Sequence, residues 1–243
     1  MEMLRVHWVN ANCGAIRFRY SLHERLHGFS AFSLSMRAAL RVGLVVEVAN
    51  AGLSPGPDPI SVPTTSPQTL ASGTGTINST GRITRSNSSP VIIISGTGST
   101  LNNSGTIEQF GSDRSVRSST ASTSISLLNL GTVSVSNGAG GQAVDWNNIL
   151  FGANSLTNHG MIRDTGEDAV RPGVNGIVMN MNTGTIAATP VLTIGNASGS
   201  DGIDGQLNTG ISVTNFGVIS GRHGMTGGDG TLALVSYLIS ITN

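Results

Sequence analysis

The stretch Leu101-Asn102-Asn103-Ser104-Gly105-Thr106-Ile107 organises this 243-residue sequence, because similar copies of it return along most of the chain. Clear copies follow at 127–133, 156–162, 180–186 and 213–219, and a weaker first copy at 77–83 has Ser79 at the Asn position. The glycines of the six copies are 24, 26, 29, 24 and 33 residues apart. Repeats of this length are typical of solenoids, in which similar turns of chain stack on one another.

Alternate positions of the motif predict which side chains point inward. Side chains of a β-strand alternate between its two faces, so Leu101, Asn103, Gly105 and Ile107 share one face. These positions hold similar residues in every copy and are predicted to face inward. The position between Asn and Gly is predicted to face outward, because it varies from Ser104 to Leu130, His159, Thr183 and Phe216. The predicted inward Asn, Gly and aliphatic residues are Asn103, Gly105, Ile107, Asn129, Gly131, Val133, Asn158, Gly160, Ile162, Asn182, Gly184, Ile186, Asn215, Gly217 and Ile219.

An inward asparagine is unfavourable unless its amide is hydrogen-bonded. Equivalent asparagines in stacked coils would lie roughly 4.8 Å apart, so their amides can bond in a ladder. The glycine two residues later would permit a tight bend or a turn with positive φ. In the copy at 180–186, Asn180 stands where an apolar residue is expected, and Met179 or Met181 would fill that position by a local shift of register.

A second, looser apolar patch follows the motif copies and predicts another strand of the same coil. It comprises Ala143-Val144, Ala169-Val170, Gly202-Ile203 and Gly224-Met225. With about two dozen residues per coil, the array would make about seven coils and extend about 30–35 Å. The sequence therefore predicts an all-β solenoid preceded by a poorly ordered or partly helical N-terminal segment.

The chain divides into three parts. Residues 1–51 are predicted to be a leader, with a signal-like segment in which Arg37 and Arg41 precede an apolar run and Ala49-Asn50-Ala51 forms a cleavage pattern. The alternative is that Met36 is the true initiator and residues 1–35 are non-native. Residues 52–69 contain five of the eight prolines and are predicted to be a linker or the first strand of the solenoid. Residues 70–243 are the predicted solenoid domain.

Composition narrows the classes of function. Charged residues make up only 11% of the chain and the formal net charge is zero, so there is no basic stripe for nucleic acid. All thirteen basic residues are arginines, which excludes lysine-dependent chemistry. Cys13 is the single cysteine, so a disulfide within the chain is excluded.

The densest charge cluster contains Arg163, Asp164, Glu167, Asp168 and Arg171. Carboxylates paired with one another or with arginine on adjacent coils would suit a polysaccharide lyase or hydrolase. The alternative is a solvated loop between strands. We favour the loop, because the sequence shows no matching acids in register on another coil.

Two further groups of residues are of types that can bind metal ions. Asp201, Asp204 and Asp229 lie in Gly-rich stretches, but the Gly-Gly-x-Gly-x-Asp pattern of calcium-binding repeats is missing, which favours ordinary turns. His159 and His223 lie 64 residues apart without Cys or His at ligand spacing. We therefore expect no catalytic, cofactor-binding or metal-binding residues.

The motif Asn-x-Gly-Thr-Ile, with Gly-rich turns and short apolar strands between copies, resembles the passenger repeats of bacterial autotransporters. The nearest matches are 103–107 and 182–186, and the resemblance covers about residues 70–225. It implies a right-handed parallel β-helix that is secreted or carried on the cell surface or outer membrane of a Gram-negative bacterium. The C-terminal translocator β-barrel of that family is missing from this chain, which continues only to Asn243.

The expected function is that of a non-enzymatic, surface-exposed or secreted β-solenoid, a fragment of an autotransporter-like passenger with a role in adhesion. Its partner would be a glycan, a matrix component or a neighbouring cell, with neither cofactor nor nucleic acid. Two alternatives remain open. One is a carbohydrate-active β-helix enzyme that uses Asp164, Glu167 and Asp168, and the other is a truncated gene product without function.

Overall fold

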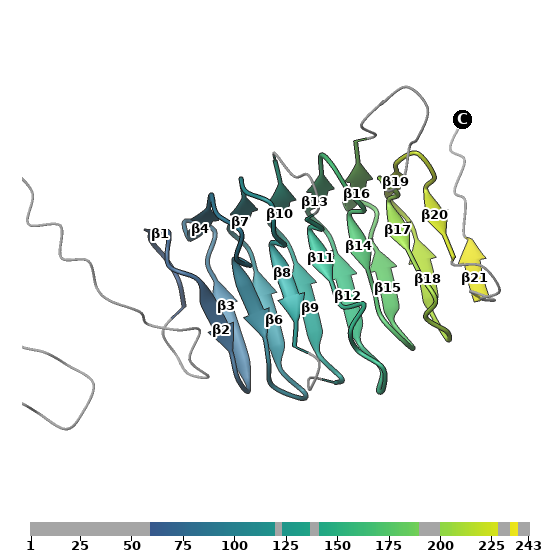
Figure 1. Ribbon diagram of the computed structural model, residues 1–243, viewed down its shortest axis with the longest axis horizontal. Coiled ribbons are helices and arrows are strands. Elements are labelled where there is room, and N and C mark those ends of the chain that lie inside the picture. Colours follow the sequence, from purple (N-terminus) through teal and green to yellow (C-terminus); the bar gives the residue numbers. More distant parts are fainter. Residues whose placement is uncertain (1–58, 120–122, 137–140, 190–199, 228–233, 238–243) are drawn as a thin grey trace, which may run out of the picture. The chain divides into compact units, whose positions relative to one another are not determined.

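The computed structural model describes residues 59–119, 123–136, 141–189, 200–227 and 234–237, all within the compact unit Val48–Asn243. The predicted leader, 1–51, lies outside the described residues. The described part consists of strands and turns without a helix. Its strands stack turn upon turn as a parallel β-solenoid (Figure 1), so the predicted all-β solenoid class is confirmed.

Successive strands enter three sheets in rotation, and each sheet has seven parallel strands in the described part of the chain. Sheet A contains β3 (Thr74–Ile77), β6 (Thr100–Asn103), β9 (Ser126–Asn129), β12 (Ser155–Asn158), β15 (Ile177–Asn180), β18 (Ser212–Asn215) and β21 (Leu234–Tyr237). Sheet B contains β1 (Pro63–Thr64), β4 (Arg82–Arg85), β7 (Thr106–Gln109), β10 (Thr132–Val135), β13 (Met161–Asp164), β16 (Thr185–Ala188) and β19 (Val218–Ser220). Sheet C contains β2 (Gln68–Leu70), β5 (Ile92–Ile94), β8 (Val116–Ser118), β11 (Val144–Asp145), β14 (Val170–Arg171), β17 (Ile203–Asp204) and β20 (Met225–Thr226). The second apolar patch of the repeats forms sheet C.

The solenoid begins inside the proline-rich stretch 52–69. Pro63 of β1 pairs with Arg82, and Gln68 of β2 pairs with Ile92. A proline cannot donate a backbone hydrogen bond, and β1 stands at the end of sheet B, where one side needs no partner strand. The described part of this stretch therefore supplies strands of the solenoid, which is the second of the two roles expected for it.

Aliphatic side chains from all three sheets fill the interior. Sheet B supplies one column in register, whose members are completely buried: Ile83, Ile107, Val133, Ile162 and Ile186. Ile219 continues this column and is partly buried. Burial of one such side chain contributes about 1.5–3 kcal/mol. The column therefore supplies a large part of the driving force for stacking.

The asparagines of sheet A form a continuous ladder, buried from Asn103 to Asn180 and partly buried at Asn215. In each step the side-chain Nδ2 donates to Oδ1 of the next asparagine at 2.8 Å, along the series Asn103, Asn129, Asn158, Asn180 and Asn215. Each of the first four Nδ2 groups also donates to a backbone carbonyl of the next turn. The ladder thus pairs the polar side chains that lie between the aliphatic columns.

The prediction that Asn182 faces inward is wrong. Asn180 occupies the ladder position opposite Asn158, and Val178 fills the apolar position opposite Leu156. Asn182 is exposed. The corner between Asn180 and the motif glycine has two more residues than the other clear copies, and these extra residues loop outward.

Insertions of this length move two other predicted positions, one in this copy and one in the first copy, where three residues separate Ile77 from Gly81. Met181, rather than Thr183, is the outward residue after the ladder asparagine. Its backbone N–H donates to the Asn158 carbonyl, just as the Phe216 N–H donates to the Asn180 carbonyl. In the first copy, Ile77 rather than Ser79 lies opposite Asn103. The ladder therefore begins at Asn103, beside an aliphatic side chain.

The motif glycines are required by close contact between turns. A Cβ on Gly131 would overlap the carbonyl oxygen of Gly105, and a Cβ on Gly160 would overlap that of Gly131. Among the described residues, the positive-φ glycines do not include the motif glycines. Of the two expected geometries, the turn with positive φ is therefore wrong, and the corner needs the glycine because a side chain would not fit.

We expect Ile186→Asp to destabilise the protein by more than about 4 kcal/mol, because it buries an unpaired charge in the aliphatic column. Ala187→Asp is the matched control, since Ala187 faces outward opposite Arg163 and should tolerate the change within about 0.5 kcal/mol. Denaturant unfolding followed by circular dichroism measures both. Equal midpoints for the two variants would contradict the inward assignment.

We expect Asn158→Ala to cost about 2–4 kcal/mol, because it removes a hydrogen-bond partner from both neighbouring ladder asparagines. Asn182→Ala should leave the free energy of unfolding nearly unchanged, since that side chain is exposed. Thermal unfolding of the two variants distinguishes the ladder residue from the inserted one. A larger loss for Asn182→Ala would overturn the register.

Candidate functional site

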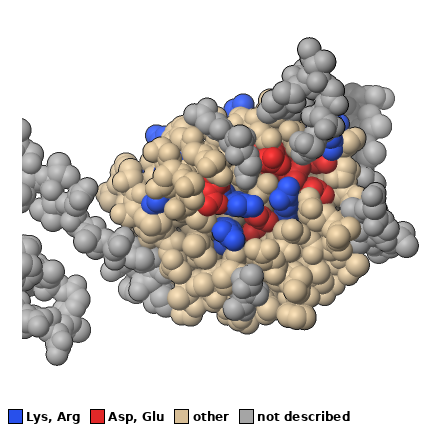
Figure 2. Space-filling view, in the orientation of Figure 1, with Lys and Arg blue, Asp and Glu red and all other residues tan. Residues whose placement is uncertain are grey.

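Charged side chains gather on the outer face of sheet C, and Figure 2 shows acidic and basic groups close together there. Arg117 lies opposite Asp145, and Asp145 lies opposite Arg171. Asp204 continues the row, because Val170 pairs with Ile203. We call Arg117, Asp145, Arg171 and Asp204 the charged row. It shows that the sequence argument against acids in register on other coils is wrong.

Arg114, in the turn before β8, ties the charged row to the corner of the solenoid. Its Nε lies 2.9 Å from Asp145 Oδ2 and 3.0 Å from Gln142 Oε1. The other oxygen of Asp145 accepts the Asn147 backbone N–H. The Arg117 side chain, in contrast, has neither an ion pair nor a hydrogen bond with any residue that the structure describes.

Asp164 points into the interior at the end of β13. Its Oδ1 accepts backbone hydrogen bonds from Gly166 and Glu167, and its buried Oδ2 has no partner in the described structure. Burial raises the pKa of Asp164 to about 7, although these backbone bonds oppose the rise. The neighbouring Arg163 faces outward on sheet B, opposite Ser134 and Ala187, so it does not join the cluster.

The buried Asp168 forms an ion pair at 2.8 Å with the partly exposed Arg171. The other oxygen of Asp168 accepts the Asp201 backbone N–H from the next turn. Burial raises the pKa of Asp168 although the Asp201 amide and Arg171 oppose the rise. The pKa of Glu167 is also raised, by burial and then by the charge of Asp168. The structure thus brings together four of the five charged residues that the sequence grouped.

Asp201 is held by the following turn. Burial alone would raise its pKa, but hydrogen bonds from Thr226, Arg222 and the His223 backbone outweigh burial and lower it. Asp204 accepts the Gln206 backbone N–H, as expected for a turn. Asp229 lies outside the described residues, and His159 stands in the outward position of its motif copy. No group of three metal-binding side chains is found where the structure describes the chain.

A second outward surface runs along the corner between sheets A and B. The backbone N–H groups of Leu130, His159, Met181 and Phe216 make equivalent bonds to the preceding turn, so these residues form one row. Met161 and Val218 lie beside that row, each opposite Thr185. The apolar members of this corner, called the apolar ridge, are Leu130, Met161, Met181, Phe216 and Val218. Leu130 is 51% exposed and Val218 is 55% exposed.

The carboxylates of the corner are poorly placed for attack on a sugar. Asp164 is completely buried, and the Asp168 side chain is only 1% exposed. A glycoside hydrolase needs two carboxyl groups that both reach the scissile bond. Arg171 and backbone N–H groups occupy three of the four oxygens of Asp164 and Asp168, and these hydrogen bonds stabilise the turns.

Sequence reasoning missed Asp145 and Arg117, although a signal was present. In each case the charged residue directly follows the aliphatic residue of the second apolar patch, as in Val116-Arg117, Val144-Asp145, Val170-Arg171 and Ile203-Asp204. Alternation along a strand places such a residue outward when the aliphatic one faces inward. Alignment of the second patches would have identified the charged row.

In comparisons with known proteins, no family model, curated protein or solved structure matches this chain. Among the described residues, no helix is long and apolar enough to cross a membrane.

We expect Asp164→Asn to become progressively more stable than the parent protein as pH rises from about 4 to 7. The carboxyl of Asp164 has a pKa of about 7 in the folded protein and 3.8 when exposed. Between these two pH values the folded state holds a proton that the unfolded state has lost, so the parent protein loses stability as pH rises. The difference between the two proteins should grow by about 1.4 kcal/mol per pH unit in this window and then level off. Urea unfolding from pH 3 to 9 measures it, and a difference independent of pH would contradict the neutral, buried carboxyl.

Proposed function

We propose that this protein is a non-enzymatic β-solenoid, secreted or displayed on the surface of a Gram-negative bacterium, that contacts a glycan, a matrix component or a neighbouring cell. The apolar ridge carries this proposal. Large apolar side chains that are exposed together on a folded protein are typical of interaction surfaces. Here they project from a stack whose inward positions are already filled by the aliphatic columns and the asparagine ladder.

The finer proposal is that the chain is an autotransporter-like passenger fragment. Two features support it: the Asn-x-Gly-x-aliphatic motif and the parallel solenoid that the motif builds. The outward positions vary while the inward positions repeat, which suits a rod whose role is to display different contact residues on a common scaffold.

The acidic corner supports a non-enzymatic role over a carbohydrate-active enzyme. Asp164 and Asp168 are buried, and only Glu167 of the three predicted acids has a partly exposed side chain, at 28%. A lone carboxylate beside Arg171 cannot supply both the acid and the base of a hydrolase.

The test is adhesion by the double variant Leu130→Ser and Phe216→Ser. We expect attachment to host or neighbouring cells and to matrix-coated surfaces to fall at least about tenfold, because two apolar contacts are lost from the ridge. Leu207→Ser is the matched control, since Leu207 is 76% exposed but lies between β17 and β18, away from that corner. Its adhesion should match that of the parent.

Either of two results would contradict the proposal. One is a parent protein that binds nothing on a glycan array, on matrix or on cells and that is found in the cytosol by fractionation. The other is turnover of a polysaccharide that is lost on joint substitution of Asp164, Glu167 and Asp168 in a folded protein.

A further inference from the structure

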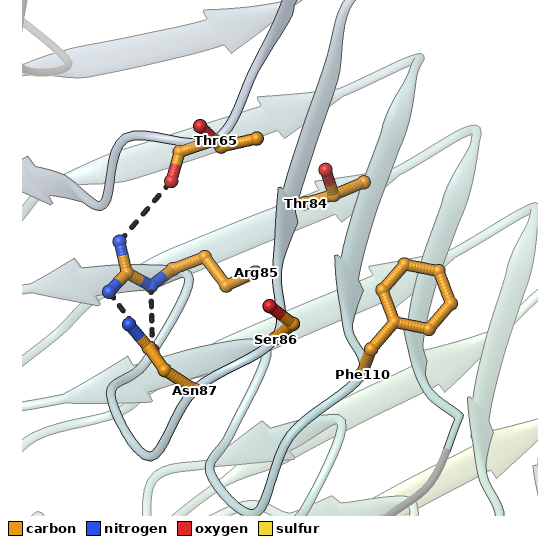
Figure 3. Close-up of a pocket in the computed structure, with 6 residues that line it drawn as sticks. All are labelled: Thr65, Thr84, Arg85, Ser86, Asn87 and Phe110. Carbon is orange, nitrogen blue, oxygen red and sulfur yellow. Dashed lines mark hydrogen bonds between the residues drawn. The ribbon is translucent and has the colours of Figure 1, made fainter.

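A hollow of about 450 Å³ opens near the first turns of the solenoid. Its walls come from three successive turns, and Figure 3 shows the side chains that line it: Thr65, Thr84, Arg85, Ser86, Asn87 and Phe110. Phe110 follows β7, and its backbone N–H bonds to the Arg85 carbonyl. The hollow is therefore built on paired strands, which fix the position of its walls.

Arg85 is held in a defined orientation but is not neutralised. Its Nε and Nη2 donate to Asn87 Oδ1 at 3.2 and 3.0 Å, and its Nη1 donates to the Thr65 carbonyl at 3.3 Å. A guanidinium has five N–H donors, so two are left for a ligand. No carboxylate among the described residues forms an ion pair with Arg85, whereas Arg82 on the same strand pairs with Glu108 at 2.7 Å.

The rest of the lining combines one aromatic ring with small polar groups. Phe110 is 37% exposed. The hydroxyls of Thr84 and Ser86 and the Nδ2 of Asn87 make no hydrogen bond to any described residue. An aromatic wall with a few fixed donors and acceptors is typical of small-ligand sites, and the volume lies within their usual range.

We propose that this hollow binds a hexuronic acid residue of an acidic polysaccharide. The free edge of Arg85 matches the two oxygens of a carboxylate, a pairing that is stronger than a neutral hydrogen bond. The hydroxyl and amide groups match the sugar hydroxyls, and the C–H face of the pyranose ring packs on Phe110. This inference rests on the proposed surface role, for which it names one class of ligand.

The experiment measures binding of a galacturonic acid oligomer to the full chain by calorimetry. We expect Arg85→Ala to weaken binding at least tenfold and Phe110→Ala at least threefold. Arg85→Lys should bind between parent and Arg85→Ala, since it keeps the charge but not the planar fork. Arg82→Ala is the matched control and should stay within twofold of the parent. Circular dichroism checks that each variant is folded.

Two ligand controls separate uronic acid from anions and from sugars in general. The oligomer whose carboxyl groups have been reduced to alcohols should bind at least tenfold more weakly, and inorganic phosphate should not compete at equal concentration. Equal binding of the reduced oligomer, or of phosphate, overturns the inference.

Failure here is distinguishable from failure of the proposed function. If the parent does not bind the oligomer, or Arg85→Ala binds it as the parent does, the hollow is not a uronate site. The proposed function still stands in that case if the Leu130→Ser and Phe216→Ser variant loses adhesion.

Discussion

The asparagine ladder is the constraint on which the other features depend. A hydrogen bond of 2.8 Å between the amides of successive turns is possible only if each turn from Asn103 to Asn215 returns an asparagine to the same place on sheet A. The motif glycines serve the same requirement, because a Cβ at Gly131 or Gly160 would push the corner away from the preceding turn. Register, spacing and the direction of every other side chain follow from this stacking.

The ladder also explains where the chain tolerates change. Extra residues enter at corners, where they can loop outward, as between Asn180 and Gly184. Residues on the outward positions face away from the interior, so the charged row and the apolar ridge differ from turn to turn without disturbing the aliphatic columns. The fold and the proposed recognition thus depend on different positions of the same strands.

The sequence was sufficient to predict the solenoid for two reasons. Inward residues occupy every second position along each strand, and the same pattern returns once in every turn of the chain. It was not sufficient at Asn182, since both Asn180 and Asn182 offer an asparagine near the glycine and only pairing with Asn158 decides between them. The hollow is harder still. Thr65, Arg85 and Phe110 come from three turns, and no spacing in the sequence shows that they share a wall.

Asp164 illustrates how one position in a repetitive stack can acquire a different property. Gln109, two turns earlier in the same column of sheet B, meets the same need with a neutral amide. Its Oε1 accepts the Gly111 N–H and its Nε2 donates to the Ser89 carbonyl. Asp164 Oδ1 accepts the equivalent backbone N–H from Gly166, but the carboxylate has no donor of its own.

Asp164 is neutral like the amide of Gln109 only when its carboxyl is protonated. This is why burial favours the proton there and raises the pKa to about 7. Because the same turn continues into Glu167 and Asp168, ionisation of Asp164 places a third negative charge at the corner, and the charges of these two residues add to the rise in its pKa. The stability of this corner therefore depends on pH, whereas the ladder, which consists of neutral amides, does not titrate.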